Sequence, residues 1–145
     1  SLTRWDSPEG RAEVVDADNF EDRKAAFRQL QDFLKKIHDA GIQVAIGTDA
    51  GTPNVPFGWG MHREMAIYVE AGLTPMQTIV AATSSGAAQM PPLGEADFGT
   101  LVPGKVADLV VLDADPLADI RNTLKINRVM RLGEWVDRPQ LLRAE

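Results

Sequence analysis

Apolar residues recur at helical spacing in the first strongly patterned stretch of the chain. Five of them share one face of a 3.6-residue period: Phe20, Phe27, Leu30, Leu34 and Ile37. Asp18 is the expected N-cap, with Glu21 three residues later in a capping-box pattern. Gly41 is the expected residue after the last turn, where a positive φ favours glycine. The pattern predicts a helix that starts near residue 18 and ends at Gly41.

A short apolar stretch follows this helix directly. Residues 42–47 are rich in β-branched side chains and end in glycine, which is typical of a buried parallel strand. The stretch leads into a loop, residues 48–53. A helix, a glycine turn, a buried strand and a loop form one αβ unit of an α/β barrel or an open sheet.

Two more helices are predicted downstream. One spans about residues 61–71. The next starts at Thr74 as N-cap, with Pro75 at the first helical position and Gln77 completing a capping box, and it ends at Met90 before two prolines. Its many small side chains favour close packing against a neighbouring element.

The chain changes to β-type patterning after residue 91. Pro103 and Gly104 suit the central positions of a type II turn. Residues 106–112 form a nearly continuous apolar strand, and residues 126–130 and 135–136 flank Gly133 as a hairpin. We therefore divide the chain into a tail or loop at 1–17, αβ units at 18–90 and a β-rich part at 91–145.

Composition and charge exclude several classes of partner. The 145 residues carry a net charge of −6, and no run of Lys or Arg exceeds two, which argues against a nucleic acid or an anionic membrane surface. No stretch reaches the roughly 18 apolar residues of a membrane span, and the first residues lack the apolar core of a signal peptide. The absence of cysteine removes disulfides and thiolate ligands, and it favours a cytoplasmic protein.

Asp49 is the strongest candidate for a catalytic residue. It follows the predicted strand at 42–47, and α/β barrels place catalytic groups at the carboxyl ends of their strands. The neighbouring Gly47 and Gly51 would let the backbone approach a ligand closely. A carboxylate there can bind a metal or act as a general base. The alternative is an aspartate that caps the next turn, and the position alone leaves both interpretations open.

The rest of the sequence supplies few metal ligands. A catalytic zinc site takes three protein ligands and a water, and the chain has two histidines, no cysteine and no His-x-His pair. His62 is a candidate for contact with substrate or metal, or a helix-start histidine that bonds to a backbone group or water. Asp108, Asp113 and Asp115 surround the predicted strand at 106–112, and we interpret them as turn and edge residues.

Several motifs, in this order and spacing, resemble the amidohydrolase superfamily, in particular its imidazolonepropionase-like and prolidase-like branch. They are Gly-Thr-Asp-Ala-Gly at 47–51, His-Arg-Glu-Met at 62–65, Ala-Gly-Leu-Thr-Pro-Met at 71–76, Ala-Ala-Thr at 81–83, the stretch 97–113, Asp-Pro-Leu at 115–117 and the stretch 129–136. The resemblance covers about residues 20–137. No single motif is decisive, but their combination is specific.

The resemblance implies the C-terminal part of a (β/α)₈ barrel together with C-terminal strands of an accessory β-sandwich. It implies a divalent metal, usually zinc, that activates water for hydrolysis of a C–N bond in a small amide or peptide substrate. Asp49, after strand 8, would bind the metal and accept a proton from the water. Phe57, Trp59 and His62 would line the substrate pocket, although packing of the two aromatic rings against the barrel rim is an equal alternative.

The chain departs from the family pattern in its other ligands. Nothing matches the early His-x-His pair, the Lys or Glu ligand, or the two later histidines. We therefore expect the isolated chain to bind metal weakly or not at all and to be inactive. Two alternatives stay open: a non-catalytic homo-oligomer whose orphan strands pair between copies, and complementation by a separate chain.

Overall fold

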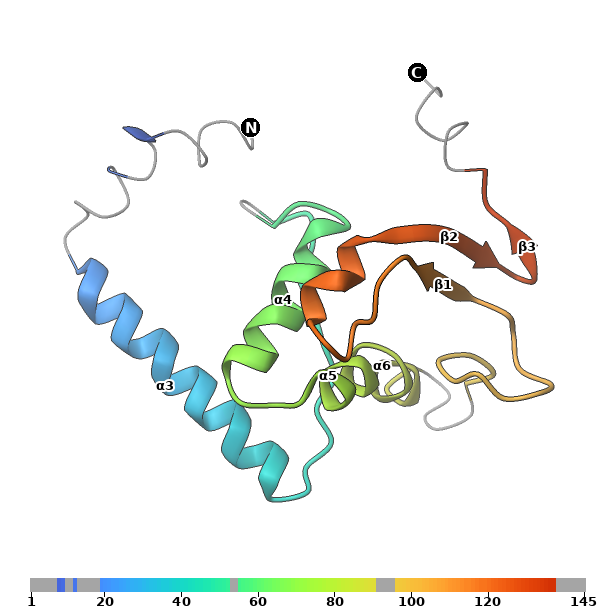
Figure 1. The fold of residues 1–145 in the computed structure, drawn as a ribbon. Coiled ribbons are helices and arrows are strands. Elements are labelled where there is room, and N and C mark those ends of the chain that lie inside the picture. The colour runs from blue at the N-terminus through green and yellow to red at the C-terminus, as the bar shows by residue number, and fades with distance from the viewer. Residues whose placement is uncertain (1–7, 10–11, 13–18, 53–54, 91–95, 138–145) are drawn as a thin grey trace.

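The structure is a computed structural model and describes residues 8–9, 12, 19–52, 55–90 and 96–137 (Figure 1). Its elements, in chain order, are the helices α3 (Phe20–Asp39), α4 (Trp59–Glu70), α5 (Pro75–Ala82) and α6 (Ser84–Ala88), the strand β1 (Leu109–Leu112), the 3₁₀ helix η1 (Ile120–Leu124) and the strands β2 (Ile126–Arg131) and β3 (Glu134–Trp135). The helices lie together, and the small sheet lies to one side of them, joined through η1 against α4.

Helix α3 starts one residue later than its sequence pattern predicts. Its N-cap is Asn19, which has a φ of 77° and makes no side-chain capping bond. Asparagine tolerates this left-handed conformation better than most residues. The Arg23 amide bonds to the Asn19 carbonyl at 2.9 Å, so the first turn is closed by the backbone. Asp18, the predicted N-cap, lies outside the described residues.

The predicted end of α3 is confirmed. Gly41 has a φ of 81°, and its amide bonds to the His38 carbonyl at 2.9 Å. The Ile42 amide reaches back to the Ile37 carbonyl at 3.1 Å. These two bonds make a Schellman motif, which satisfies carbonyl groups at the helix end and turns the chain toward residues 42–48.

The predicted strand at residues 42–47 does not form. The structure assigns no strand there, and Ile42 is 56% exposed rather than buried. Among the described residues, the backbone of this stretch bonds to the backbone of other elements at two points: the Ile42 amide to the end of α3, and the Ile46 amide to the Ala81 carbonyl at 3.1 Å. A β-ladder needs a neighbouring strand, and none of the residues from 19 onward that the structure places supplies one here.

The helix predicted at 74–90 is correct at its start and wrong in its continuity. The capping box forms, with the Gln77 amide bonded to Thr74 Oγ1 at 3.2 Å and the Thr74 amide to Gln77 Oε1 at 2.8 Å. The helix then breaks at Thr83, whose φ and ψ are −125° and −90°. The Thr83 hydroxyl donates to the Ile79 carbonyl at 2.7 Å, an alternative to the regular helical bond. Two short helices, α5 and α6, therefore replace one.

The predicted β elements form an antiparallel sheet in the order β1-β2-β3. The type II turn at Pro103 is confirmed, because Gly104 has a φ of 89° and the Lys105 amide bonds to the Val102 carbonyl at 3.2 Å. The strand predicted at 106–112 is shorter and starts at Leu109. Strands β2 and β3 join through a two-residue hairpin loop in which both residues have positive φ, as a type I′ turn requires.

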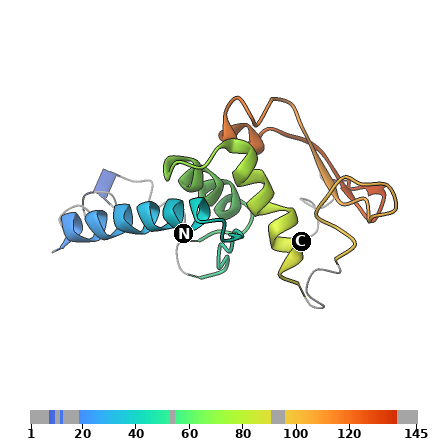
Figure 2. The same ribbon diagram turned by 90° about the horizontal axis from the view of Figure 1, so that it is seen from below.

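The buried core is small and lies where α4, α5, α6 and η1 meet. Its apolar members are Met65, Leu73, Ala81, Ala87 and Ile120. Helix α3 contributes no fully buried residue, and much of it projects beyond the other helices when the molecule is seen from below (Figure 2). Exposed apolar side chains on α3 include Phe27, Leu30 and Phe33. The apolar face of α3 is therefore only partly covered in this structure.

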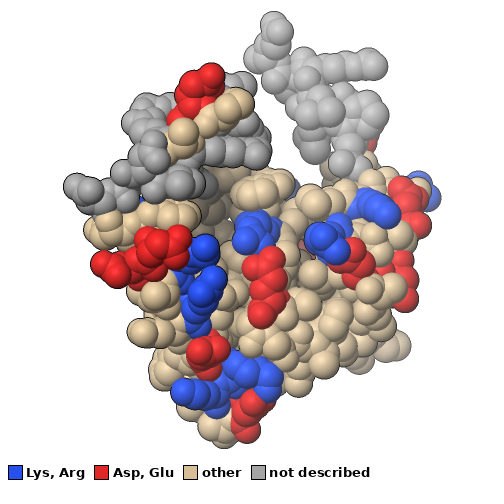
Figure 3. All heavy atoms as spheres, turned by 60° about the vertical axis from the view of Figure 1, so that its left-hand side comes forward, with Lys and Arg blue, Asp and Glu red and all other residues tan. Residues whose placement is uncertain are grey.

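The face that includes α3 carries acidic and basic groups side by side, with no field of one sign (Figure 3). Two ion pairs on the helices reflect this mixture: Lys35 with Asp39, and Arg63 with Glu70 at 2.9 Å. None of the helices placed by the structure is long and apolar enough to cross a bilayer. The predicted boundary near residue 91 falls within residues 91–95, outside the described residues, and stays a prediction.

Candidate active site

Asp49 lies directly after the 42–48 segment, on the surface. Its φ is 51°, a left-handed conformation that costs a non-glycine residue free energy and that aspartate adopts more readily than most. The Asp49 carbonyl accepts the Thr52 amide at 3.2 Å, which closes a tight turn. Gly51 beside it has a φ of 101°. The carboxylate is thus presented to solvent from a constrained loop.

Phe57 closes the other side of this loop. A Cβ atom added to Gly51 would lie 2.8 Å from the Phe57 ring, so the glycine lets the ring rest on the loop backbone. The Gly51 amide bonds to the Val55 carbonyl at 3.0 Å and holds the loop closed. The Phe57 ring is otherwise 79% exposed, and Trp59, in the first turn of α4, is 51% exposed. The Phe57 ring against the Asp49 loop, and the Trp59 ring two residues further along the chain, are therefore open to a ligand.

Helix α4 holds the segment that leads to Asp49 through two polar side chains that sequence reasoning missed. The Gly47 amide donates to Glu64 Oε1 at 3.3 Å, and the Tyr68 hydroxyl donates to the Ala45 carbonyl at 3.1 Å. Burial raises the pKa of Glu64, an effect that the Gly47 amide partly offsets, and burial and the nearby Glu64 raise the pKa of Tyr68. Glu64 belongs to the His-Arg-Glu-Met motif at 62–65, which was the available signal.

His62 points toward η1. Its Nδ1 lies 2.9 Å from Thr123 Oγ1, and the Thr123 hydroxyl donates to the Ile120 carbonyl at 2.8 Å. Since that hydroxyl has a single proton, His62 Nδ1 donates and Thr123 accepts. The neutral ring then keeps Nε2 as its lone-pair nitrogen. Burial lowers the pKa of His62, which favours the neutral form.

We expect His62 to make folding sensitive to mild acid. Folding lowers the pKa of His62 from 6.5, so the unfolded chain binds more protons than the folded chain at mildly acidic pH. The free energy of unfolding is therefore largest above about pH 6.5 and falls as the pH drops below that value. Urea unfolding at several pH values measures this loss. His62→Gln keeps a donor for Thr123 but does not titrate, and it should flatten the profile there. Equal profiles for both proteins would contradict the assignment.

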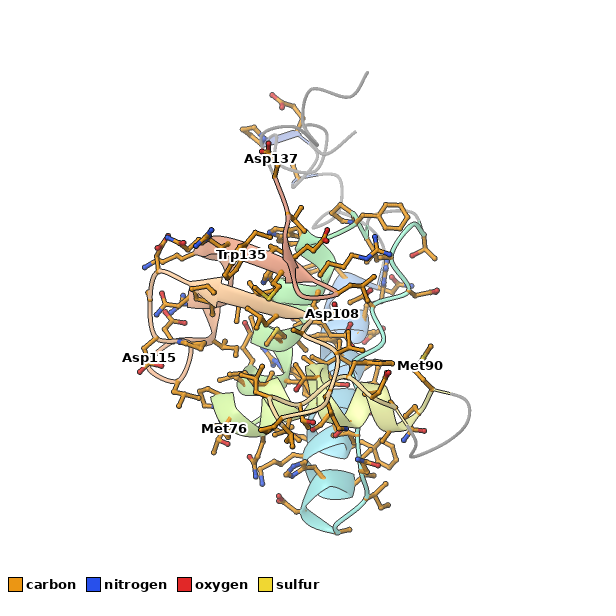
Figure 4. The ribbon with its side chains drawn as sticks, turned by 90° about the vertical axis from the view of Figure 1, so that its right-hand side faces the viewer. Met76, Met90, Asp108, Asp115, Trp135 and Asp137 are labelled. Carbon is orange, nitrogen blue, oxygen red and sulfur yellow. The ribbon has the colours of Figure 1, made fainter. Side chains whose placement is uncertain are left out.

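The three acidic residues around β1 have the structural roles that the sequence predicts. Asp108 accepts the Leu132 amide at 2.6 Å in the hairpin turn, and Asp113 accepts from the Asn127 side chain at 2.6 Å. Asp115 accepts the Leu117 amide at 2.8 Å, an Asx turn. Asp108 and Asp115 lie at opposite ends of the sheet (Figure 4). They are not grouped as ligands.

The described residues do not fit a complete metal centre. No three His, Asp or Glu side chains among them lie close enough together to hold an ion. Asp49 is exposed and fits a single ligand position, whereas the His62 Nδ1 atom is engaged by Thr123. Any metal at Asp49 would need further ligands from beyond these residues.

A cavity of about 420 Å³ lies elsewhere, between the end of α3 and α5. Its lining includes His38, Ile42, Val44, Met76, Val80 and Ser85, and none of the predicted site residues. It is open to solvent, and the Met76 side chain at its edge projects from the surface (Figure 4). We place the candidate site at the Asp49 loop instead, because an exposed carboxylate on a non-glycine residue with positive φ is there.

Comparison with known proteins gives the family. The model of the amidohydrolase family matches residues 15–136, so this chain belongs to that family. It is 35% identical over 113 residues to an imidazolonepropionase of Cutibacterium acnes, covering 74% of this chain and 28% of that protein. It is 40% identical over 86 residues to an imidazolonepropionase of Streptomyces coelicolor, covering 55% of this chain and 20% of that protein.

Solved structures agree with this family. A Xaa-Pro dipeptidase with bound methionine in its active site superimposes with a TM-score of 0.64 at 29% identity, covering 74% of this chain and 25% of that one. Phenylurea hydrolase B gives 0.57 at 36% identity, covering 65% and 20%. These neighbours are amidohydrolase barrel proteins, and the observed helices with a small sheet fit part of such an α/β fold, which confirms the predicted fold class. The chain spans between about a fifth and 28% of the length of these relatives.

Proposed function

We propose that this chain contributes Asp49 to the active site of a metal-dependent hydrolase that cleaves C–N bonds in small amide or peptide substrates. The observation that carries the proposal is an exposed aspartate in a left-handed conformation, at the end of the 42–48 segment and between Gly47 and Gly51. Strain of this kind clusters at functional sites. The names of the relatives, which include imidazolonepropionases and a Xaa-Pro dipeptidase, support a small substrate.

Each group at the Asp49 loop has a distinct role in the proposed reaction. A divalent metal, zinc by family precedent, would be held in part by Asp49 and would supply a more acidic water. Asp49 Oδ accepts a proton from the attacking water, and its backbone conformation directs the carboxylate. Phe57 and Trp59 offer exposed rings for an apolar part of the substrate. His62 would act at this pocket only through Nε2, because Nδ1 is bonded to Thr123.

We expect the 145-residue chain by itself to hold no stoichiometric metal and to hydrolyse no amide. The reason is that the described residues bring no three ligand side chains together. Elemental analysis after zinc loading, with an assay on a panel of dipeptides and cyclic amides, measures both properties. A polypeptide or complex that completes the ligand set, here called the assembled hydrolase, should gain activity with zinc and lose it to a chelator. One tightly held zinc and turnover in the isolated chain would contradict the proposal.

A second candidate function is a module that pairs its strands between copies. One observation that favours it is the open edge of β1, where Val110 is 53% exposed and Val111 is 38% exposed. The other is the 42–47 segment, which pairs with no strand among the described residues. Unpaired apolar strand edges recruit further strands. Sedimentation equilibrium of the chain should then give a dimer or larger species, and Val110→Lys should shift it toward monomer. A monomer at high concentration would exclude this function.

A further inference from the structure

One face of α4 lies along the segment that ends at Asp49. Glu64 and Tyr68 are four residues apart and therefore share this face. Glu64 accepts the Gly47 amide at 3.3 Å, and Tyr68 donates to the Ala45 carbonyl at 3.1 Å. The helix and the segment therefore run in opposite directions, since the later helix residue, Tyr68, contacts the earlier segment residue, Ala45.

Gly60 continues the same face by one more helical turn. A Cβ atom added to Gly60 would lie 3.8 Å from Thr48 Cβ and 2.9 Å from a methyl group of Val55. The glycine therefore brings the first turn of α4 against the residue just before Asp49. Three residues of α4, one turn apart, thus contact three residues of the segment: Gly60 lies next to Thr48, Glu64 to Gly47 and Tyr68 to Ala45.

These contacts take the place of a β-ladder. The described residues give the 42–47 segment no strand partner, and the Ile46 amide is held by the Ala81 carbonyl at 3.1 Å. Within the part of the chain that the structure describes, the Gly47 amide has the Glu64 carboxylate as its one partner. An amide bonded to a charged acceptor is held more firmly than one bonded to a neutral group. The backbone two residues before Asp49 therefore depends on Glu64.

We propose that Glu64 is a positioning residue, whose carboxylate holds the Gly47 amide and so sets the place and direction of the Asp49 side chain. This inference rests on the function proposed for Asp49. Glu64 bonds to the backbone before Asp49 and acts through it. Tyr68 holds the same segment one turn further from Asp49, where its effect on the carboxylate is smaller.

Hydrogen exchange of the Gly47 amide in the 145-residue chain tests the contact. Glu64→Leu removes the acceptor at similar size and should raise the exchange rate about tenfold to a hundredfold, as loss of a charged hydrogen-bond partner predicts. Glu64→Gln keeps a weaker acceptor and should raise it about threefold to tenfold. The Asp49 Cα and Cβ chemical shifts, which report its φ, should move in the same order. Tyr68→Phe is the matched control and should leave both readouts near wild type.

The outcomes separate this inference from the proposed function. In the assembled hydrolase, Glu64→Leu should lower kcat and leave KM within about twofold, with partial recovery in Glu64→Gln. Unchanged Gly47 exchange in both Glu64 variants would overturn the inference, as would faster exchange with unmoved Asp49 shifts. If Glu64→Leu does not fold, the Glu64→Gln comparison decides alone. Absence of hydrolysis by the wild-type assembly would overturn the proposed function and leave the exchange result valid.

Discussion

Asp49→Asn should lower the kcat of the assembled hydrolase by about 10²- to 10⁴-fold, the range that a positioned proton acceptor contributes. Asparagine tolerates the left-handed backbone at φ 51° as aspartate does, so the loop should keep its conformation. The substitution therefore removes the negative charge and the basicity of the side chain while it preserves the shape of the site. Steady-state kinetics on the best substrate of the amide panel, at saturating zinc, measure the effect.

Asp32→Asn is the matched control for this experiment. Asp32 is an exposed carboxylate in α3, away from the Asp49 loop in sequence. Its replacement by asparagine removes the same charge as Asp49→Asn. Its kcat should stay within about twofold of wild type, because surface charges distant from a reaction contribute little at physiological ionic strength. Thermal unfolding of both variants should match that of the wild type. Full activity in Asp49→Asn would remove Asp49 from the mechanism, whatever the control does.

Gly99→Ala should destabilise the chain by about 2–5 kcal/mol. Gly99 has a φ of 85°, which costs an L-residue about 1–2 kcal/mol. Its added Cβ would also lie 2.5 Å from the buried Ala87 Cβ and 3.2 Å from the Thr83 carbonyl oxygen. Overpacking of this kind costs about 1–3 kcal/mol more. Urea unfolding of the two proteins, with equal m-values, measures the difference in free energy.

Gly104→Ala isolates the backbone part of this cost. Gly104 has nearly the same φ, 89°, but an added Cβ would meet nothing within 4 Å. It should therefore lose only about 1–2 kcal/mol. The difference between the two variants gives the packing contribution at the point where the loop after residue 96 rests on α6. Equal destabilisation by both substitutions would show that α6 yields without cost and that Gly99 does not fix this loop.

Local signals in the sequence predicted the elements whose stability is local. The capping box at Thr74, the Schellman glycine at Gly41 and the turn at Gly104 each depend on bonds within a few residues, and all three are confirmed. The break at Thr83 was missed because helical periodicity continues across it, while the threonine hydroxyl competes for the Ile79 carbonyl. Small differences between competing bonds of this kind are invisible to periodicity.

The prediction of a strand at 42–47 was wrong for a different reason. Its apolar, β-branched composition is typical of a strand, but a strand exists only with a neighbour, and the described residues provide none. The same limit applies to the candidate site. The sequence singled out Asp49, Phe57, Trp59 and His62, and whether they act together stays a prediction. Of these, the structure brings Phe57 to the Asp49 loop and turns His62 Nδ1 to Thr123.

The sequence by itself determined the family, the capping box at Thr74 and the helix end at Gly41. The signals for these properties lie within short stretches of the sequence. Only the tertiary structure decided that Glu64 bonds to the Gly47 amide and that Thr123 engages His62. These pairs lie 17 and 61 residues apart, so their meeting depends on how α4 packs against its neighbours, which no local pattern encodes.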